Sequence, residues 1–372
     1  MKRIIFMFLM VGIVSSNGWH DAQAGIKKRI MVVSSYHREY LWSQDTNEGV
    51  CAALLGFGYM DDKSQAARYT KDDYVETSKA IIQKMWMDTK RKNSLADIAQ
   101  TTKNVTDVVE KFNPDIILLG DDNAANYIGN HFIDTQIPIV FWGVDVRPDK
   151  YGLVDSIAKP GHNVTGVYQP GYSKEGVDFL LKLLPEIKTM AILSDDSETG
   201  RAKAKNVQQL AEQGKIPVTI IGTVMTNSQS AWKAGAMELA KTADAFFVVN
   251  HNTIKDEKGR PVEPFELGAW YLRNIKKPDI TPEKQFIEEG FLLAVNDSGF
   301  MQGYEAVRMA HRILSEGAKP ATMTPFAPGR GKLMLNRERA RMLGLAQGIQ
   351  DNPLIEEIIE TSKALAQYPE IR

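Results

Sequence analysis

The sequence predicts an α/β protein built from two doubly wound lobes, each with a parallel β-sheet. Short apolar runs alternate with longer stretches of helical periodicity over most of the chain. These runs are apolar along their whole length, which is typical of parallel strands covered by helices on both faces. The alternation is interrupted at 143–163, where Pro, Gly, Asp and Lys predominate, and then begins again. A length of 372 residues is sufficient for two domains.

The composition excludes several classes of protein. Hydrophobic residues make up 43% and charged residues 24%, as in ordinary soluble proteins. The formal net charge of -1 provides no basic field for a nucleic acid. Cys51 is the single cysteine, so neither an internal disulfide nor a cysteine-based zinc site can form. The common phosphate, dinucleotide, zinc-protease and serine-hydrolase motifs are missing, and the six histidines lack metal-ligand spacing, so we expect no cofactor and no metal.

The first residues have the features of a secretory signal. Lys2 and Arg3 precede an apolar run at 4–14, and a polar stretch then ends in the Ala-Gln-Ala motif that closes at Ala24. This order predicts cleavage after Ala24 and an export route to the periplasm. The apolar run is too short to span a bilayer, although an uncleaved anchor is the alternative. No later stretch is long and apolar enough to span one, so we expect a soluble mature chain.

The first αβ series occupies the chain up to about residue 142. Its apolar runs predict strands at 30–33, 66–70, 116–119 and 137–142. Helical periodicity predicts helices at 43–55, 75–89, 95–112 and 123–132.

The second series begins after the break. Strands are expected at 164–167, 190–193, 217–221, 245–249 and 291–295. Helices are expected at 174–184, 201–213, 230–241 and 303–314, and the tail predicts two short strands and a helix at 353–366. The segment 255–277 is a polar insertion with a helical pattern at 265–275. These elements suggest the following division: signal peptide 1–24, first lobe 25–144 plus 291–319, second lobe 145–290 plus 320–350, C-terminal helix and tail 351–372.

Polar residues follow the ends of six expected strands. Ligands of doubly wound sheets bind beyond the carboxyl ends of the strands, so two sheets facing one cleft would bring these residues together. The candidate ligand-binding residues are Ser34, Ser35, Tyr36, Asp121, Asp122, Asn123, Trp142, Asp145, Asp195, Ser197, Asn250, His251, Asn252, Asn296 and Asp297.

These residue types suit a small polar ligand. Hydroxyl groups and helix N-termini can hold a ligand carboxylate. Asp122, Asp145 and Asp297 could accept charge-assisted hydrogen bonds from a ligand ammonium group. The alternative is structural, because Ser, Asp and Asn between a strand and a helix are common N-caps. Trp142 could equally be a core residue, and His251 could lie in a solvated loop.

Several segments of the second half resemble the ABC transporter substrate-binding family that includes tryptophan- and tyrosine-binding proteins. The most specific is Pro-Gly-His-Asn-Val-Thr-Gly at 160–166, preceded by matching pieces at 137–141 and 152–154. Further matches are at 243–245, 252–253, 303–320 and 336–344. The resemblance covers most of the mature chain. It implies a type I periplasmic binding fold, with two αβ lobes, three crossing segments and a cleft that closes on ligand.

The candidate site departs from the pattern of that family. Asp121 and Asp122 stand where the family usually has two small residues, and His251 replaces the first residue of an Asp-Asn-Thr motif. Ser298, next to Asp297, stands where the family has an acidic residue. The resemblance therefore implies the fold and the broad role, but it does not imply an aromatic amino acid as the ligand.

The sequence as a whole predicts a periplasmic substrate-binding protein of an ABC importer, not an enzyme. It would capture a small polar molecule, with amino-acid-like compounds among the candidates, by hinge closure. Its expected partners are that ligand and an ABC permease in the inner membrane, and the chain itself is expected to be a monomer. One alternative is a ligand-binding subunit for a membrane sensor. The other is a periplasmic enzyme that uses cleft carboxylates such as Asp121, Asp122 and Asp195.

Overall fold

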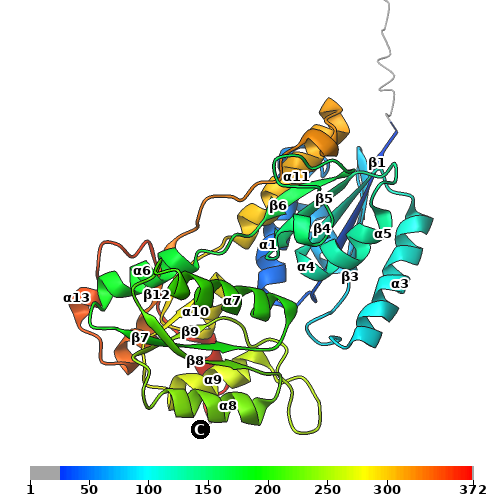
Figure 1. Cartoon of the computed structure of the whole chain (residues 1–372). Helices are drawn as coiled ribbons and strands as arrows, with labels where there is room; N and C mark the ends of the chain where they lie inside the picture. Colours follow the sequence, from blue (N-terminus) through cyan, green and yellow to red (C-terminus); the bar gives the residue numbers. More distant parts are fainter. Residues whose placement is uncertain (1–25, 371–372) are drawn as a thin grey trace, which may run out of the picture.

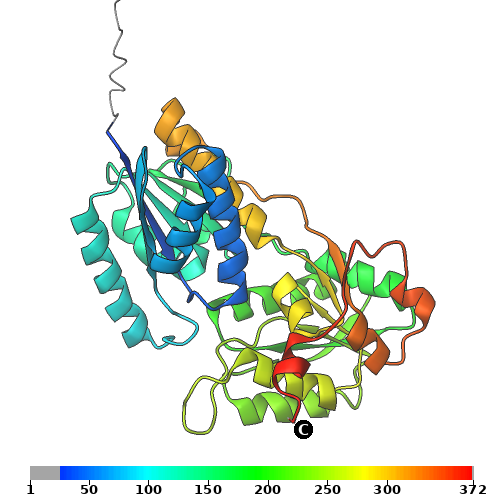
Figure 2. The ribbon, with the colours of Figure 1, turned by 180° about the vertical axis from the view of Figure 1, so that it is seen from behind.

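The computed structural model describes residues 26–370, and the predicted signal segment lies outside this range. The chain forms two α/β lobes, each with its own sheet, joined by three segments (Figures 1 and 2). The predicted fold class is confirmed. No helix within residues 26–370 combines the length and the apolar character needed to cross a membrane.

The sheet of the first lobe has six strands in the order β2-β3-β1-β4-β5-β6. All neighbours are parallel except β2 and β3, which are antiparallel. In register, Ile30 of β1 lies between Ile82 of β3 and Ile116 of β4, and all three are buried. The strands are β1 (Lys28–Ser34), β2 (Tyr74–Glu76), β3 (Ala80–Trp86), β4 (Ile116–Gly120), β5 (Ile139–Val144) and β6 (Val164–Tyr168).

Helices cover both faces of this sheet (Figure 1). The longest begin and end at recognisable caps: Ser94 caps α3 through the Asp97 N–H, and Asn113 ends it in the left-handed conformation. Glycine allows α1 and α11 to pack closely, since a Cβ on Gly303 would lie 2.2 Å from the Thr46 carbonyl oxygen. The helices are α1 (Leu41–Gly56), α2 (Lys63–Asp72), α3 (Leu95–Phe112), α4 (Asp121–Asn123), the π-helical η1 (Ala124–Gly129), α5 (Asn130–Phe132), η2 (Pro148–Lys150), α11 (Gly299–Glu316) and η3 (Pro320–Thr322).

The sheet of the second lobe has seven strands in the order β13-β12-β11-β10-β9-β7-β8. Its neighbours are parallel except β11 and β12. The strands are β7 (Thr189–Ser194), β8 (Thr219–Met225), β9 (Ala245–Val248), β10 (Asp279–Thr281), β11 (Leu293–Val295), β12 (Leu333–Asn336) and β13 (Glu357–Ile359). The helices are α6 (Ser173–Leu183), α7 (Glu198–Glu212), α8 (Gln229–Leu239), α9 (Pro264–Asn274), α10 (Lys284–Glu289), α12 (Arg337–Met342), α13 (Gln347–Gln350) and α14 (Lys363–Gln367).

Three of the expected elements have a different structure, and the short β10 and α10 were not expected from the sequence. The expected strand 66–70 lies inside α2, whose N-cap is Asp62. The expected helix 75–89 is instead β2 and β3, because burial along β3 alternates with a period of two and the strand pairs with β1 along its whole length. The expected helix 353–366 is replaced by β13, which pairs with β12, and by the short α14.

The lobe boundaries also lie elsewhere than expected. β6 pairs with β5, so the first lobe continues past 144 to Tyr168, and the chain crosses at 169–172. β11 belongs to the second sheet, so the return crossing is at 296–298 instead of 291. The third crossing follows Phe326, which still pairs with Val167 of the first lobe. The tail after 350 is part of the second lobe, because β13 forms the edge of its sheet.

Candidate functional site

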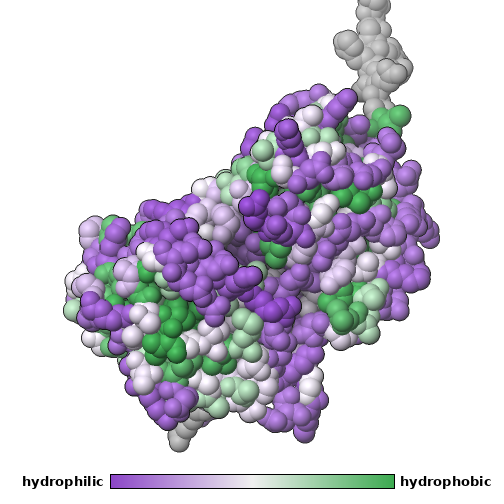
Figure 3. Space-filling view, viewed as in Figure 1, coloured by the Kyte–Doolittle hydropathy of each residue, from purple (hydrophilic) through white to green (hydrophobic). Residues whose placement is uncertain are grey.

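A small cavity lies between the two lobes, at the carboxyl ends of both sheets. Its volume is about 10 Å³, which is room for about one water molecule. The first lobe contributes residues at or after the ends of β1, β3, β4, β5 and β6, and the second contributes residues that follow β7, β9 and β10. On the face shown in Figure 3, the surface along the junction of the lobes is largely hydrophilic. The cavity is lined by Tyr36, Tyr40, Trp42, Lys90, Asp121, Gly143, Asp145, Gln169, Thr199, Val249, Asn250 and Glu283.

One wall of the cavity is aromatic. Tyr36, Tyr40 and Trp42 form a buried cluster in the segment that links β1 to α1. The Tyr36 and Tyr40 rings meet edge to face, with centroids 5.3 Å apart. The Lys90 ammonium lies 4.3 Å from the Tyr36 ring centroid and 5.4 Å from that of Tyr40, which are cation–π distances.

Asp121 places a carboxyl group beside this wall. Its Oδ1 accepts a hydrogen bond of 2.6 Å from the Trp42 indole N–H. The residue has a φ of 69°, a left-handed conformation that is uncommon outside glycine. Burial raises the pKa of Asp121 to about 8, and the Asp122 carboxyl adds to this rise, whereas the Trp42 hydrogen bond opposes it. A pKa of about 8 favours the protonated, uncharged form of the Asp121 carboxyl at neutral pH.

Lys203 connects the two lobes on another side of the cavity. Its ammonium, on α7 of the second lobe, lies 3.3 Å from Asp145 of the first lobe and also pairs with Glu283 of the second. All three side chains are at most 10% exposed. Burial alone would lower the pKa of Lys203, but the two carboxylates outweigh it and raise the pKa. Asp297 lies behind this group, and burial raises its pKa to about 7 against the effect of Lys203.

Direct hydrogen bonds between the lobes close the cleft around the cavity. The Tyr40 hydroxyl of the first lobe accepts hydrogen bonds from Asn252 at 2.9 Å and from Gln285 at 2.8 Å. The Tyr151 hydroxyl donates a hydrogen bond of 2.9 Å to the Glu198 carboxylate of the second lobe. The hydroxyl groups of Tyr36 and Thr199 form a hydrogen bond of 3.4 Å between the lobes. These contacts can form only when the two sheets face each other at short range, so the structure represents a closed arrangement.

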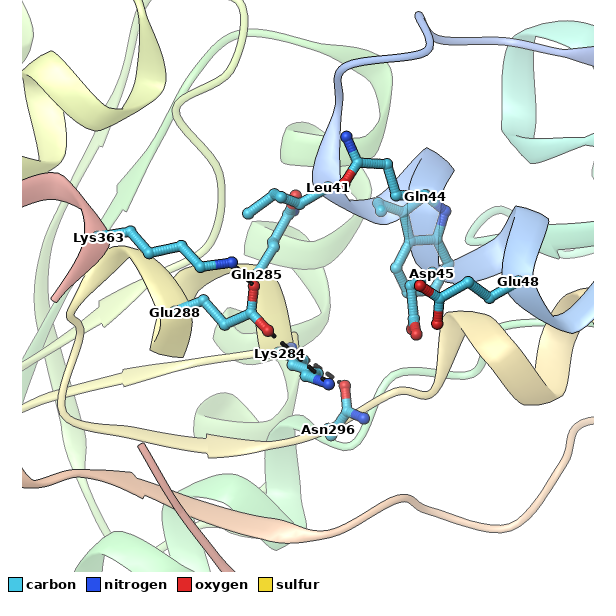
Figure 4. A pocket seen from close by; sticks show the side chains of 10 residues that line it. Leu41, Gln44, Asp45, Glu48, Lys284, Gln285, Glu288, Asn296 and Lys363 are labelled. Atoms are coloured by element: carbon cyan, nitrogen blue, oxygen red, sulfur yellow. Dashed lines mark hydrogen bonds and ion pairs between the residues drawn. The ribbon is translucent and has the colours of Figure 1, made fainter. Parts of the chain in front are cut away.

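A second, wider pocket opens at one side of the cleft (Figure 4). It has a volume of about 170 Å³ and lies between α1 of the first lobe and α10 and α14 of the second. Glu288 pairs here with Lys363 at 2.6 Å and with Lys284 at 3.7 Å. Asn296 lies in this pocket, where its Oδ1 accepts the Lys284 N–H, and not in the cavity between the lobes.

The structure brings some of the sequence-predicted residues to the cavity and leaves others outside its wall. Those in the wall are Tyr36, Asp121, Asp145 and Asn250. Asp122, Asn252 and Asp297 lie directly behind the wall. Asp122 accepts hydrogen bonds there from the Val146 N–H and from the Tyr151 hydroxyl. A role in ligand binding stays a prediction for all of them.

Other predicted residues have structural partners instead. Ser35 donates to the Gly120 carbonyl and accepts from the Ala124 N–H, which fixes the end of β1 against β4. Asp195 and Ser197 organise the start of α7, since Ser197 caps the Gly200 N–H and Asp195 accepts from Ser197 and the Thr253 N–H. Ser34 is buried at the end of β1, and Asn123 accepts from Thr89.

Two predicted residues lie in hydrophobic cores and are corrected here. Trp142 is 1% exposed and packs over Gly120 inside the first lobe, because β5 is a central strand and its side chain points away from the cleft. His251 is fully buried among Trp232, Phe286 and Phe291, and its Nε2 lies 2.8 Å from Glu289. Neither lines the cavity, and the solvated-loop interpretation of His251 is wrong.

Sequence reasoning missed several residues of the wall. Lys90 was not recognised, because the segment before it was expected to be a helix. Lys90 follows the carboxyl end of β3, and an expected strand there would have identified it as a candidate site residue. Tyr40 lies six residues beyond β1 and has no motif of its own. Glu283 in the wall and Lys203 behind it have no local signal, because a charged residue in an amphipathic helix or a loop is ordinarily solvated.

The raised pKa of Asp121 predicts a pH dependence of stability. The folded protein keeps a proton on this carboxyl up to about pH 8, whereas an unfolded chain releases it near pH ~4. The Asp121 contribution is therefore fully present below pH ~4 and is lost as the pH rises towards about 8. Urea denaturation across this range should show a decline in the free energy of unfolding that is smaller in Asp121→Asn. An equal decline in both proteins would contradict the assignment.

Comparisons with known proteins agree with this architecture. Residues 73–356 match the model of the family described as ABC transporter substrate binding protein. A Streptococcus pneumonia structure, described as an ABC domain in complex with L-Trp, has 21% identity and a TM-score of 0.69. A conserved domain protein from Vibrio cholerae has 17% identity and a TM-score of 0.69. The ligand-free, open form of a substrate-binding protein with adhesive properties from Clostridium difficile has 20% identity and a TM-score of 0.66.

Each of these three comparisons covers 90% of this chain and 100% of the other. At these identities the likeness is one of fold. No curated protein matches the sequence.

Proposed function

The chain belongs to the ABC transporter substrate-binding protein family, and from that premise we propose that it captures a small polar ligand between its lobes by hinge closure and delivers it to an ABC permease. The ligand would occupy the cavity lined by the aromatic wall, Asp121, Asp145 and Glu283, with Lys203 behind Asp145 and Glu283. The predicted signal supports a periplasmic location for this step. The family resemblance inferred from the sequence is confirmed.

The observation that carries the proposal is that the polar groups of the cavity come from both lobes. Asp145 and Lys203 pair across the cleft, and Tyr40 of the first lobe accepts from two amides of the second. In an open form these groups would separate and become solvated. A ligand that bonds to both walls would therefore shift the equilibrium towards the closed form, by its differential affinity for that form.

The proposal is tested by a thermal-shift screen of small polar molecules, followed by small-angle X-ray scattering with the hits. A ligand should raise the melting temperature saturably, as RT ln(1 + [L]/Kd) requires, and should reduce the radius of gyration. Mass spectrometry should recover the ligand unchanged. If no compound stabilises the protein, or if stabilisation leaves the radius of gyration unchanged, capture by hinge closure is contradicted.

Asp121→Asn should weaken binding of the tightest hit by about tenfold or more, because a donor group of the ligand would favour the ionised form of Asp121, and that carboxylate accepts a charge-assisted hydrogen bond that an amide cannot replace. Asp122→Asn is the comparison, since Asp122 faces Val146 and Tyr151 behind the cavity wall. It should weaken binding less than Asp121→Asn does. Titration calorimetry measures both, and unchanged affinity in Asp121→Asn would show that the Asp121 carboxyl is structural.

Two other functions give different results in the same experiments. A ligand-binding subunit for a membrane sensor would bind and close in the same way, but deletion of its gene would leave uptake of the ligand unchanged. An enzyme using the cleft carboxylates would convert the compound, and mass spectrometry would detect the product.

A further inference from the structure

Lys90 occupies an unusual position for a lysine. Its side chain is 4% exposed, and its ammonium lies over the Tyr36 and Tyr40 rings at 4.3 Å and 5.4 Å. Within residues 26–370 this ammonium makes neither an ion pair nor a hydrogen bond. Lys90 and Asp121 line the same cavity, and the charge of Lys90 opposes the rise in the pKa of the Asp121 carboxyl. A cation thus lies between an aromatic wall and a carboxyl group, inside a cavity.

The remainder of the cavity is acidic. Asp121, Asp145 and Glu283 contribute three carboxyl groups to the wall, whereas Lys90 is its one ammonium among the described residues. Lys203 balances part of this charge from behind the wall. Asp297 is 3% exposed, and its Oδ2 has no hydrogen-bond partner within the described part of the chain. Buried carboxyl groups in excess over cations stay ionised only at a cost, so they either take up protons or are neutralised by a further positive group.

We propose that the ligand of this cavity is an organic cation, and that its amino group takes the place now held by the Lys90 ammonium, over Tyr36 and Tyr40 and beside Asp121. Aromatic faces attract cations through the ring quadrupole, most strongly where water is excluded. This inference rests on the proposed function and specifies the chemical class of its ligand. Lys90 then acts as an internal occupant that a ligand must displace.

Lys90 has a place to move to. Lys90 lines the inner cavity and also a groove on the solvent side of the cleft. Tyr36 and Thr199 likewise line both the cavity and this groove. Asp196 and Glu198 of the second lobe line this outer groove together with Arg201, which pairs with Asp196 at 2.8 Å. A displaced Lys90 ammonium would exchange the aromatic rings for water and for these two carboxylates, without an unpaired charge being left buried.

The ligand class is tested with four compounds that share a four-carbon chain: 1,4-diaminobutane, 4-aminobutanoate, 1,4-butanediol and succinate. These are included in the thermal-shift screen described above. We expect the diamine to stabilise the protein more than the zwitterion, and the diol and succinate to have no effect. More broadly, the hits of the screen should be cations.

The second test changes Lys90 itself. Lys90→Met should tighten binding of 1,4-diaminobutane, or of the tightest cationic hit, by about three- to thirtyfold, because the cation–π contact no longer has to be broken. Lys92→Met is the matched control, since Lys92 lies in the same loop, is exposed, and loses the same charge. It should leave the affinity unchanged.

The outcomes separate the two proposals. If the screen finds ligands but they are neutral, zwitterionic or anionic, or if Lys90→Met weakens binding, then Lys90 contacts an acidic group of the ligand and the cation inference is overturned, while the proposed function stands. If no compound of any charge class binds, the proposed function fails and this inference fails with it. Tighter binding of a cation by Lys90→Met alone supports both.

Discussion

Lys203→Met is expected to weaken ligand binding by roughly a hundredfold or more. In the closed form the Lys203 ammonium lies between Asp145 of the first lobe and Glu283 of the second, with all three groups buried. Removing one member of a buried charge group costs about 3–5 kcal/mol, because the remaining charges lose their compensation. In an open form the same carboxylates would be hydrated, so the cost falls mainly on closure.

Titration calorimetry with the tightest hit of the screen measures this effect. Lys205→Met is the matched control, because Lys205 is on the same helix, is exposed, and loses the same charge. It should bind normally. If Lys203→Met also binds normally, the ion pair between the lobes contributes nothing to closure, and the closed form must be held by the Tyr40 hydrogen bonds instead.

Arg339→Ala is expected to lower the free energy of unfolding by about 3–5 kcal/mol. Arg339 and Asp279 are both fully buried in the second lobe and are joined by hydrogen bonds of 2.9 and 2.7 Å. The guanidinium also donates to the carbonyl groups of Leu272, Ile275 and Lys277, at the end of α9. Alanine would leave a buried carboxylate and several carbonyl groups without donors, in addition to a cavity.

Urea denaturation of three further variants isolates the cause of this loss. Arg341→Ala removes an exposed arginine two residues away, whose nearest carboxylate, Glu360, is 3.9 Å distant, and should cost less than about 0.5 kcal/mol. Arg339→Met with Asp279→Asn should lose less than Arg339→Met alone, because no charge is then left unpaired. If Arg339→Ala unfolds like Arg341→Ala, the buried pair does not hold α9, β10 and α12 together.

The sequence by itself determined the fold class and most of the elements. Strands β4, β5, β7 and β9 are short runs of apolar residues, and such a run is stable only when both faces of the strand are covered. This is a local property of each segment, so it can be read without knowledge of the partners. The same applies to the helix caps Ser94 and Ser197, which bond to N–H groups three residues away.

Only the tertiary structure decided which residues form the cavity. β3 contains Lys84, which is buried and whose ammonium donates a hydrogen bond of 2.8 Å to the Asn47 side chain on α1. No local sequence pattern predicts that contact. Tyr40 and Gln285 meet across 245 residues of sequence, and Lys203 reaches Asp145 in the opposite lobe. A charged side chain in a surface helix and the same side chain between two lobes have the same local sequence. The two positions differ in whether the opposite lobe displaces the water around the charged group. This depends on the fold of the whole chain.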